Sequence, residues 1–516
     1  MAQTQTTLLS GNLILGSATA LPANTVLATT NNSEVGLANG VVIPANCALV
    51  MASATPYEFQ VPYLSGEGTW SGPITLKGAG NDFGFVGAFT GSGLNITGPI
   101  DATGAPGATV FFGRDQANYF GPSSSTVYIT LETPLSIVDG TVELDYQYFA
   151  DEQLQLTLKA QNHWTNMLVD RGTIYIRTNN ALPPNAPITG EVPTGKSLYF
   201  ELGGFNQTVG GLNISLEDGS SSCVIGTGYP NQTSVLTFAG NNSPSTFGGS
   251  IQDNFLNPGA NAIMSLTVAS GTLNLNNICE YTGPTLVSGG RLNIVGPQGS
   301  LGDSFGGGLT PVTVSGTGSL GGTGTIYGPV TNAPGGTLSP GNSPGTLSVN
   351  NTVTLQSGST CWMEVNNASS TNDMLVASGG INFGGTLVIT NISPVGYTNG
   401  QIIQLFSPGN SGAFSSIVMP EVGSYDATNL ASAGTIQVLS MVSLAPVTIT
   451  SLVSGGSLNL SWPLDHTGWR LEFQTNTLSA GLGTNWFTWP GSTATNALSI
   501  PVKPANGSVF LRLAYP

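Results

Sequence analysis

The chain has 516 residues with 71 glycines and 40% hydrophobic residues, which is too apolar for a disordered chain and too rich in glycine for a helical one. Its net charge is −16, and Arg291 is the only lysine or arginine between Leu202 and Met441. Nucleic acid is therefore excluded as a partner, because phosphate binding needs clustered basic side chains. The abundant Thr, Ser, Asn and Val predict an all-β protein.

The N-terminus carries no targeting signal. Residues 1–5, MAQTQ, lack the basic and apolar regions of a signal peptide, and we interpret them as a mature terminus behind an added Met. No stretch reaches the roughly 20 apolar residues that a transmembrane helix needs. Scarce Lys, Arg and Glu beside abundant Thr, Asn and Gly favour an exported protein, located outside the cell or on its outer surface.

Charged residues concentrate between Glu132 and Glu201. Glu143 and Asp145 lie two apart, which on a strand places both carboxylates on one face, and Asp151 and Glu152 follow at a predicted bend. Paired carboxylates are the apparatus of polysaccharide-cleaving enzymes, and acid clusters also bind calcium. The alternative, which we prefer, is a solvated strand face with its apolar residues turned inward.

The remaining candidates for metal or nucleophilic chemistry are isolated. His163 and His466 each stand alone, which favours surface or hydrogen-bonded imidazoles. The cysteines form no CxxC pair, so their spacing excludes a zinc site and leaves buried thiols or one or two disulfides. They are Cys47, Cys223, Cys279 and Cys361. We predict no cofactor, no metal site and no catalytic residue.

A short phrase returns along the chain: a glycine, a small polar residue, then Leu, Ile or Val, with alternating residues after it. Its clearest copies are GTLNLNN at Gly271, GRLNIVG at Gly290, GSLGGTG at Gly318, GTLSPGN at Gly336, GTLSVNN at Gly345 and GTLVITN at Gly385. The first intervals are 19, 28, 18 and 9 residues. A strand of about five residues plus a turn of about four fits these intervals. We therefore predict a solenoid with two or three strands per turn.

Two longer strings carry a resemblance to a known family. YTGPTLVSGGRLNI at 281–294 and GGTLSPGNSPGTLSVNNTVTLQSGS at 335–359 resemble the autotransporter-associated β-strand repeat of secreted bacterial surface proteins. The resemblance implies a right-handed parallel β-helix, exported and displayed at the cell surface. We assign residues 1–442 to it, with looser repeats before residue 130. The resemblance implies an architecture and a delivery route, not an activity.

Residues 443–516 read differently, as alternating strands 10 to 14 residues apart with four of the seven tryptophans. This pattern predicts a small antiparallel β-sandwich, fibronectin-III-like or similar to sorting and attachment domains, which would also cap the solenoid. We prefer the interpretation that the tryptophans supply the core of this domain. The alternative is a stacking platform for sugar rings, for which Trp486 and Trp489 are the pair we expect to be exposed.

These observations favour an exported structural or adhesive β-helix without enzymatic activity. The expected partner is a surface glycan or protein, and self-association along exposed strand edges is possible for such a rod. The first competing hypothesis is a pectate-lyase-like enzyme acting through the Glu132–Glu201 region. The second is a carbohydrate-binding protein acting through the C-terminal tryptophans.

Overall fold

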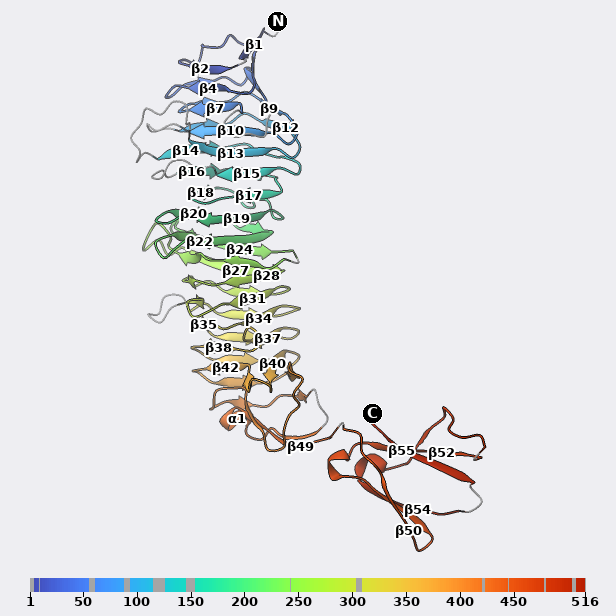
Figure 1. Ribbon diagram of the computed structural model, residues 1–516. Coiled ribbons are helices and arrows are strands. Elements are labelled where there is room, and N and C mark those ends of the chain that lie inside the picture. The colour runs from blue at the N-terminus through green and yellow to red at the C-terminus, as the bar shows by residue number, and fades with distance from the viewer. Residues whose placement is uncertain are drawn as a thin grey trace.

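The computed structural model is an elongated rod of stacked turns with a smaller module at its C-terminal end (Figure 1). The structure describes residues 4–8, 10–54, 61–87, 93–114, 126–144, 154–241, 243–302, 309–419, 423–443, 445–477, 479–503 and 507–515. The sequence prediction of an all-β, parallel solenoid is confirmed. Strands follow one another around the rod in a regular cycle, so the rod has three faces.

Face 1 is a long parallel sheet that follows the whole rod. Its strands are β2 (Gly11–Leu15), β4 (Ser33–Leu37), β7 (Tyr63–Gly66), β10 (Asp82–Gly87), β13 (Thr109–Arg114), β15 (Thr141–Leu144), β17 (Asn166–Leu168), β19 (Pro187–Val192), β22 (Gly211–Leu216), β25 (Ser245–Phe247), β28 (Thr272–Leu275), β31 (Arg291–Ile294), β34 (Ser319–Gly322), β37 (Thr337–Pro340), β40 (Thr360–Asn366), β44 (Thr386–Asn391) and β47 (Ser416–Val418). The short β41 (Thr371–Asn372) pairs antiparallel with β40.

Face 2 consists of two parallel sheets, joined by a bridge between Gln252 and Glu280. The first contains β5 (Val42–Ile43), β8 (Thr69–Trp70), β11 (Leu94–Ile96), β14 (Val127–Leu131), β16 (Leu154–Leu158), β18 (Gly172–Ile176), β20 (Ser197–Glu201), β23 (Ser222–Thr227) and β26 (Ser250–Asp253). The second contains β29 (Ile278–Cys279), β32 (Ser300–Leu301), β35 (Thr325–Ile326), β38 (Thr346–Val349) and β42 (Met374–Ala377).

Face 3 also consists of two parallel sheets, one in each half of the rod. The N-terminal sheet contains β1 (Thr4–Leu8), β3 (Thr25–Thr29), β6 (Ala48–Ala52), β9 (Ile74–Lys77) and β12 (Ile100–Gly104). The C-terminal sheet contains β21 (Gln207–Val209), β24 (Thr233–Ala239), β27 (Ile263–Ser270), β30 (Thr285–Val287), β33 (Val312–Val314), β36 (Val330–Asn332), β39 (Val353–Leu355), β43 (Ile381–Phe383) and β46 (Ser411–Gly412).

Five of the six clear copies of the returning phrase lie where the chain enters face 1, and the copy at Gly345 begins β38 of face 2 instead. Leu273, Leu292, Leu320 and Leu338 occupy one register position on successive strands, so three successive turns take 19, 28 and 18 residues. All four leucines are fully buried. Because side chains alternate across a strand, the polar residues on either side of Leu273, Leu292 and Leu338 lie on the outer surface. Leu320 is followed instead by the buried Gly321.

One continuous hydrophobic core fills the rod from Leu15 to Val438. The four cysteines belong to this core and are free thiols, so the interpretation as buried thiols is confirmed. Its C-terminal end is closed by an antiparallel sheet of β45 (Ile402–Gln404), β49 (Thr435–Met441) and β48 (Gly423–Asp426), with the short helix α1 (Leu430–Ala433).

This cap corrects one expectation. We expected residues 443–516 to close the solenoid, but Phe406, Leu430 and Ile436 of the 402–441 region pack into the solenoid core instead. The module beyond it has a separate core around Leu460, Trp462 and Leu471. The physical reason is that the antiparallel sheet and the helical turn already cover the apolar end of the last solenoid turn. The C-terminal module is therefore not needed to cover it.

The C-terminal module contains two three-stranded antiparallel sheets whose apolar faces share that separate core. One sheet contains β50 (Thr450–Ser454), β51 (Ser457–Ser461) and β54 (Ala497–Pro501). The other contains β53 (Phe487–Thr488), β52 (Arg470–Asn476) and β55 (Ser508–Ala514). Two short 3-10 helices, η2 (Leu464–His466) and η3 (Ser492–Ala494), connect the strands.

Candidate functional site

Of the four acidic candidates between residues 132 and 201, Glu143 lies among the described residues. Glu143 lies on β15, half-buried between the buried Val142 and Leu144, as the strand-face interpretation expects. The other three candidates, Asp145, Asp151 and Glu152, fall outside the described residues. Among the residues that the structure describes, no group of three or more His, Cys, Asp or Glu side chains could hold a metal ion.

Three of the described acids of that region, Glu132, Asp170 and Glu201, are engaged in structural contacts. Glu132 accepts a hydrogen bond from Lys159 Nζ at 2.7 Å, and Asp170 pairs with Arg171 at 3.4 Å. Glu201 is buried and accepts the backbone N–H groups of Gly203 and Gly228, at 2.8 and 3.1 Å. Burial raises the pKa of Glu201, but its hydrogen bonds tie two turns of face 2 together.

Next to Glu201 lies an aromatic cluster that no sequence pattern predicts. The guanidinium of Arg177 lies 5.0 Å from the ring centre of Tyr175 and 4.8 Å from that of Tyr229. These distances are typical of cation–π contacts. The alternating YIR at 175–177 places Tyr175 and Arg177 on the same outer side of the chain. Tyr229 follows β23, two turns further along the rod than Tyr175. No local sequence pattern shows that these two residues are close in space.

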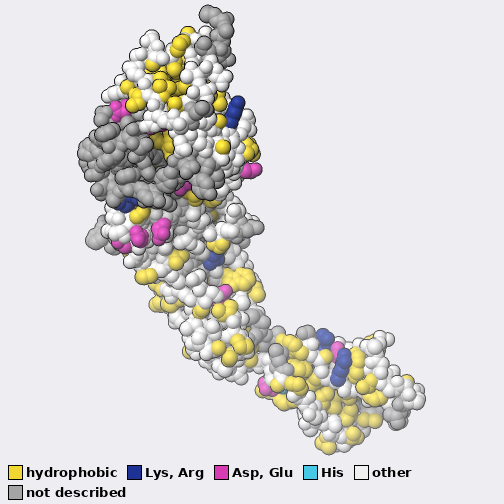
Figure 2. Space-filling model, turned by 45° about the horizontal axis from the view of Figure 1, so that its top comes forward, with side chains coloured by type: hydrophobic (Ala, Val, Ile, Leu, Met, Phe, Trp, Pro, Cys, Tyr) yellow, Lys and Arg dark blue, Asp and Glu magenta, His cyan; other side chains and the backbone are white. Residues whose placement is uncertain are grey.

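A polar groove of about 890 Å³ lies on face 1, across β19, β22, β25 and β28. Most of its lining is amide, hydroxyl and backbone, so it offers hydrogen-bond donors and acceptors rather than charge. The polar lining includes Thr189, Asn213, Ser215, Asp218, Ser221, Thr246, Asn276, Asn277 and Gln298. In the view of Figure 2, charged side chains form isolated patches on a surface dominated by uncharged groups.

Asp218 is the one carboxylate among the described residues that line this groove. Its oxygen Oδ1 accepts hydrogen bonds from the backbone N–H and hydroxyl of Ser220, at 2.8 and 2.6 Å. These hydrogen bonds lower the pKa of Asp218 to about 2. The group is therefore ionised at neutral pH and cannot donate a proton there, as a general acid must.

The groove continues into a lane of hydrogen-bonded side chains along face 1. Thr246, Asn274 and Asn293 share one register position on β25, β28 and β31. Asn274 Nδ2 donates to Thr246 Oγ1 at 3.3 Å, and Asn293 Nδ2 donates to Asn274 Oδ1 at 2.9 Å. Arg291 extends the lane by donating to Asn293 Oδ1 at 2.8 Å.

Face 3 carries a second outward lane, made mostly of threonine. One residue from each of seven successive strands is aligned by the strand pairing. Six of these residues are threonines, and the seventh is Leu286 on β30. The threonines are Thr208, Thr237, Thr267, Thr313, Thr331 and Thr354. Neighbouring strands of a sheet lie about 4.8 Å apart, so this lane repeats a hydroxyl and a methyl group at that spacing.

The two candidate tryptophans lie on opposite sides of the chain around β53. Trp486 lies under Arg512, whose guanidinium is 4.2 Å from the ring centre, on the outer face of its sheet. Trp489 faces the inside of the module, where it packs edge-to-face on Phe473 at 5.2 Å. Both are half-buried. The two rings thus point to opposite sides, as residues three apart on an extended chain do.

One histidine is on the surface and the other is hydrogen-bonded, as expected for isolated histidines. His163 is exposed on the third side of the rod. His466 is buried, with its ring nitrogens 2.8 Å from Asp465 Oδ1 and 2.7 Å from the carbonyl oxygen of Ala445. His466 therefore fixes the start of the C-terminal module to the segment that leads into it.

The fold and these surfaces define an all-β protein of the parallel solenoid class, with polar outer lanes and a separate C-terminal module. No family model matches the chain, and no curated protein matches it. Among solved structures it is similar to the Hap adhesin of Haemophilus influenzae, with 10% sequence identity and a TM-score of 0.24. That similarity covers 80% of this chain and 64% of the other, so the chain spans less than two thirds of its neighbour. Similarity at this level carries no weight for function.

Proposed function

We propose that the protein is an exported structural or adhesive rod without enzymatic activity, which contacts a hydroxyl-rich glycan or a protein at a surface. The observation that carries the proposal is the groove on face 1, with its amide and hydroxyl lining and its one ionised carboxylate. Amides and hydroxyls match the alternating donors and acceptors of a neutral glycan. The solenoid repeats such groups on a rigid scaffold over many turns.

The low pKa of Asp218 favours binding over chemistry in this groove. Hydrolysis of a glycosidic bond needs one protonated and one ionised carboxyl group on either side of the bond. Asp218 supplies the ionised form alone, and the remaining described lining offers no second carboxyl group. A lyase instead cleaves by β-elimination and needs a base. The described lining contains no Lys or Arg to act as that base, so a pectate-lyase-like activity would have to use a different surface, such as the one near Glu143.

Binding of the purified chain to a glycan array and to insoluble polysaccharides tests the adhesive function. The double variant Asn276→Ala/Gln298→Ala removes two exposed amides from the groove and should weaken binding. Asn382→Ala removes an exposed amide from face 3 and serves as the matched control. Equal binding by all three proteins would refute the groove as the contact surface.

Two further measurements test the remaining parts of the proposal. Release of reducing ends from pectins, alginates or glucans, with or without calcium, would show that the protein is an enzyme. Fractionation of the native organism with an antibody to the solenoid tests export. Recovery of the protein in the cytosol would contradict a surface location.

A further inference from the structure

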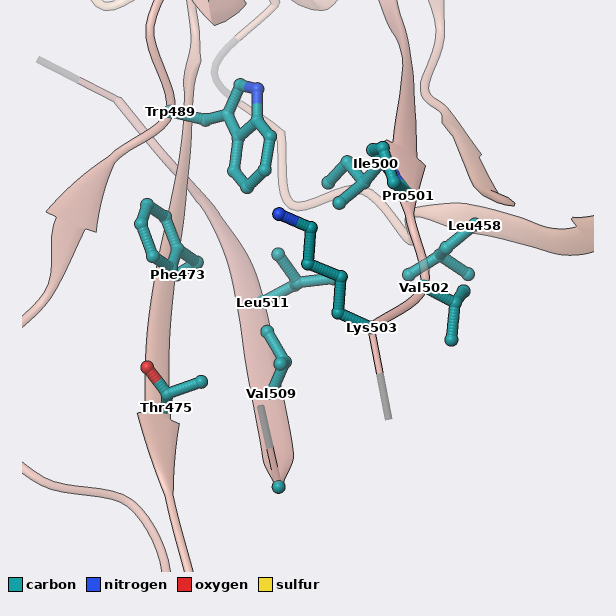
Figure 3. Close-up of a pocket in the computed structure, with 11 residues that line it drawn as sticks. Leu458, Phe473, Thr475, Trp489, Ile500, Pro501, Val502, Lys503, Val509 and Leu511 are labelled. Atoms are coloured by element: carbon teal, nitrogen blue, oxygen red, sulfur yellow. The ribbon is translucent and has the colours of Figure 1, made fainter. Parts of the chain in front are cut away.

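A cleft opens between the two sheets of the C-terminal module. Its volume is about 710 Å³, within the range of small-molecule sites. Leu458 and Ile500 line it from the β51–β54 side, and Phe473 and Leu511 from the β52–β55 side. Figure 3 shows these side chains facing a common space, with Trp489 at one end.

The chemistry of the lining selects for an apolar ligand. Aliphatic and aromatic side chains make up most of the walls, and Thr475 and Lys503 are the polar side chains among the described lining residues. A sugar would need several hydrogen-bond partners at close range, which two side chains do not supply. A flexible alkyl chain needs none, and it gains free energy from each methylene group that it buries, about 0.8 kcal/mol.

Lys503 gives the cleft a charge preference. Its side chain extends across the opening with the ammonium group directed toward Trp489 (Figure 3), and no acidic residue is among the described lining residues. The other two cations of the module are engaged, because Arg470 and Arg512 both bind Glu472, at 2.8 and 2.7 Å. Lys503 can place its stem on the apolar walls and its charge on a ligand.

An added β-strand is a poorer occupant than a small molecule. The cleft borders the edge strand β54, which ends at Pro501. Proline has no backbone N–H to donate to a neighbouring strand, and proline and lysine are residues that natural proteins place at strand edges to prevent pairing. Pro501 and Lys503 together disfavour strand addition at this edge.

We propose that this cleft binds a free fatty acid, a single alkyl chain that ends in a carboxylate. The alkyl chain lies between Phe473 and Leu511 on one side and Leu458 and Ile500 on the other. The carboxylate accepts a charge-assisted hydrogen bond from Lys503 Nζ, which is a strong type of hydrogen bond. The proposal is independent of the glycan contact on face 1, which lies in a different part of the chain.

The test uses the full-length protein and monomeric laurate below its micellar concentration, with 11-(dansylamino)undecanoic acid as the displaced fluorescent probe. Laurate should displace the probe, whereas dodecanol and dodecyltrimethylammonium should bind more weakly. Lys503→Gln should weaken laurate binding about tenfold and leave dodecanol unchanged. Lys77→Gln, at an exposed lysine of the rod, is the matched control and should leave both unchanged.

A second pair of variants separates the cleft from the other exposed apolar side chains of the module. Val509 lines the cleft and is 44% exposed, and Leu452 lies outside the lining and is 65% exposed. Val509→Glu should abolish laurate binding, and Leu452→Glu should not. Equal binding of all three amphiphiles, insensitivity to Lys503→Gln, or binding to phosphatidylglycerol vesicles without binding to monomeric laurate would overturn the proposal.

Discussion

Asn293 donates a hydrogen bond from Nδ2 to Oδ1 of Asn274 at 2.9 Å, across the pair of strands β28 and β31. Its own Oδ1 accepts a hydrogen bond from Arg291 Nε at 2.8 Å, so one side chain connects two turns of the solenoid and the lone cation of the region. In-register polar side chains thus stabilise the outside of the sheet, as stacked leucines stabilise the inside.

Asn293→Ala should lower the free energy of unfolding by about 1 kcal/mol, because it removes two side-chain hydrogen bonds and leaves Arg291 without one acceptor. Chemical denaturation measures the change. Asn12→Ala, at an exposed asparagine of β2 on the same face, is the control and should have a smaller effect. Equal effects of both substitutions would show that the lane contributes nothing to stability.

The four cysteines should be unreactive in the folded protein. They are free and buried, and burial raises the pKa of Cys279 to about 12 and also raises the pKa of Cys223 and Cys361. Since the thiolate is the reactive form, a thiol reagent such as Ellman's reagent should label none in the native state and four in guanidinium chloride. Rapid labelling of the native protein, or fewer than four thiols after unfolding, would contradict the structure.

Gly98 lies at a corner where successive turns meet without room for a side chain. A Cβ atom at Gly98 would lie 1.9 Å from the carbonyl oxygen of Gly72, which is fixed backbone. Gly98→Ala should therefore destabilise the N-terminal turns by about 1 to 3 kcal/mol through overpacking. Thermal unfolding and amide hydrogen exchange of β8 and β11 measure this effect.

The matched control is Gly16→Ala, since a Cβ atom at Gly16 would meet nothing within 4 Å. That substitution should change stability by about 0.5 kcal/mol or less, as surface substitutions commonly do. Equal stability of Gly98→Ala and Gly16→Ala would contradict the close approach of the backbone at Gly98 and Gly72.

The solenoid could be predicted from the sequence because its rule is local. A glycine, a polar residue and a leucine recur at a fixed offset on several turns, so the register of Leu273 and Leu292 follows from their spacing alone. The three-sided cross-section was within the predicted two or three strands per turn. The end cap was missed because Phe406 and Leu430 enter the core from irregular positions, with no repeat to mark them.

The surfaces were harder to predict than the fold. The lane from Thr246 to Asn293 depends on pairing between strands that are 19 and 28 residues apart, and the groove of face 1 depends on loops from several turns. The sequence likewise did not show that Trp486 and Trp489 point to opposite sides, because their orientation depends on the extended conformation of the chain between them. A three-residue step on an extended chain separates side chains.

The C-terminal module should fold apart from the rod. Its core around Leu460, Trp462 and Leu471 is separate from the core that fills the solenoid. Deletion of residues 443–516 should therefore leave the circular dichroism spectrum and unfolding midpoint of the solenoid nearly unchanged. Aggregation of the shortened chain, or loss of its cooperative unfolding, would show that the module is needed to cap the rod.

The last prediction concerns Asp373, which is 1% exposed and accepts the backbone N–H groups of Gly345 and Glu364, each at 2.9 Å. Burial raises its pKa from 3.8 to about 6, against the opposing effect of these two hydrogen bonds. The folded chain therefore binds more protons than the unfolded chain between these two pH values. Stability must fall as the pH rises through this window, since deprotonation places a charge in the interior.

Asp373→Asn removes this titration. The free energy of unfolding of the wild-type protein, relative to that of the variant, should fall by up to about 3 kcal/mol between pH 3.8 and about 6 and stay level outside that window. Asp101→Asn is the control, because hydrogen bonds from Thr103 lower the pKa of that exposed carboxyl group. A constant difference between wild type and Asp373→Asn across the window would contradict the prediction, because it would mean that burial does not outweigh the two hydrogen bonds from Gly345 and Glu364.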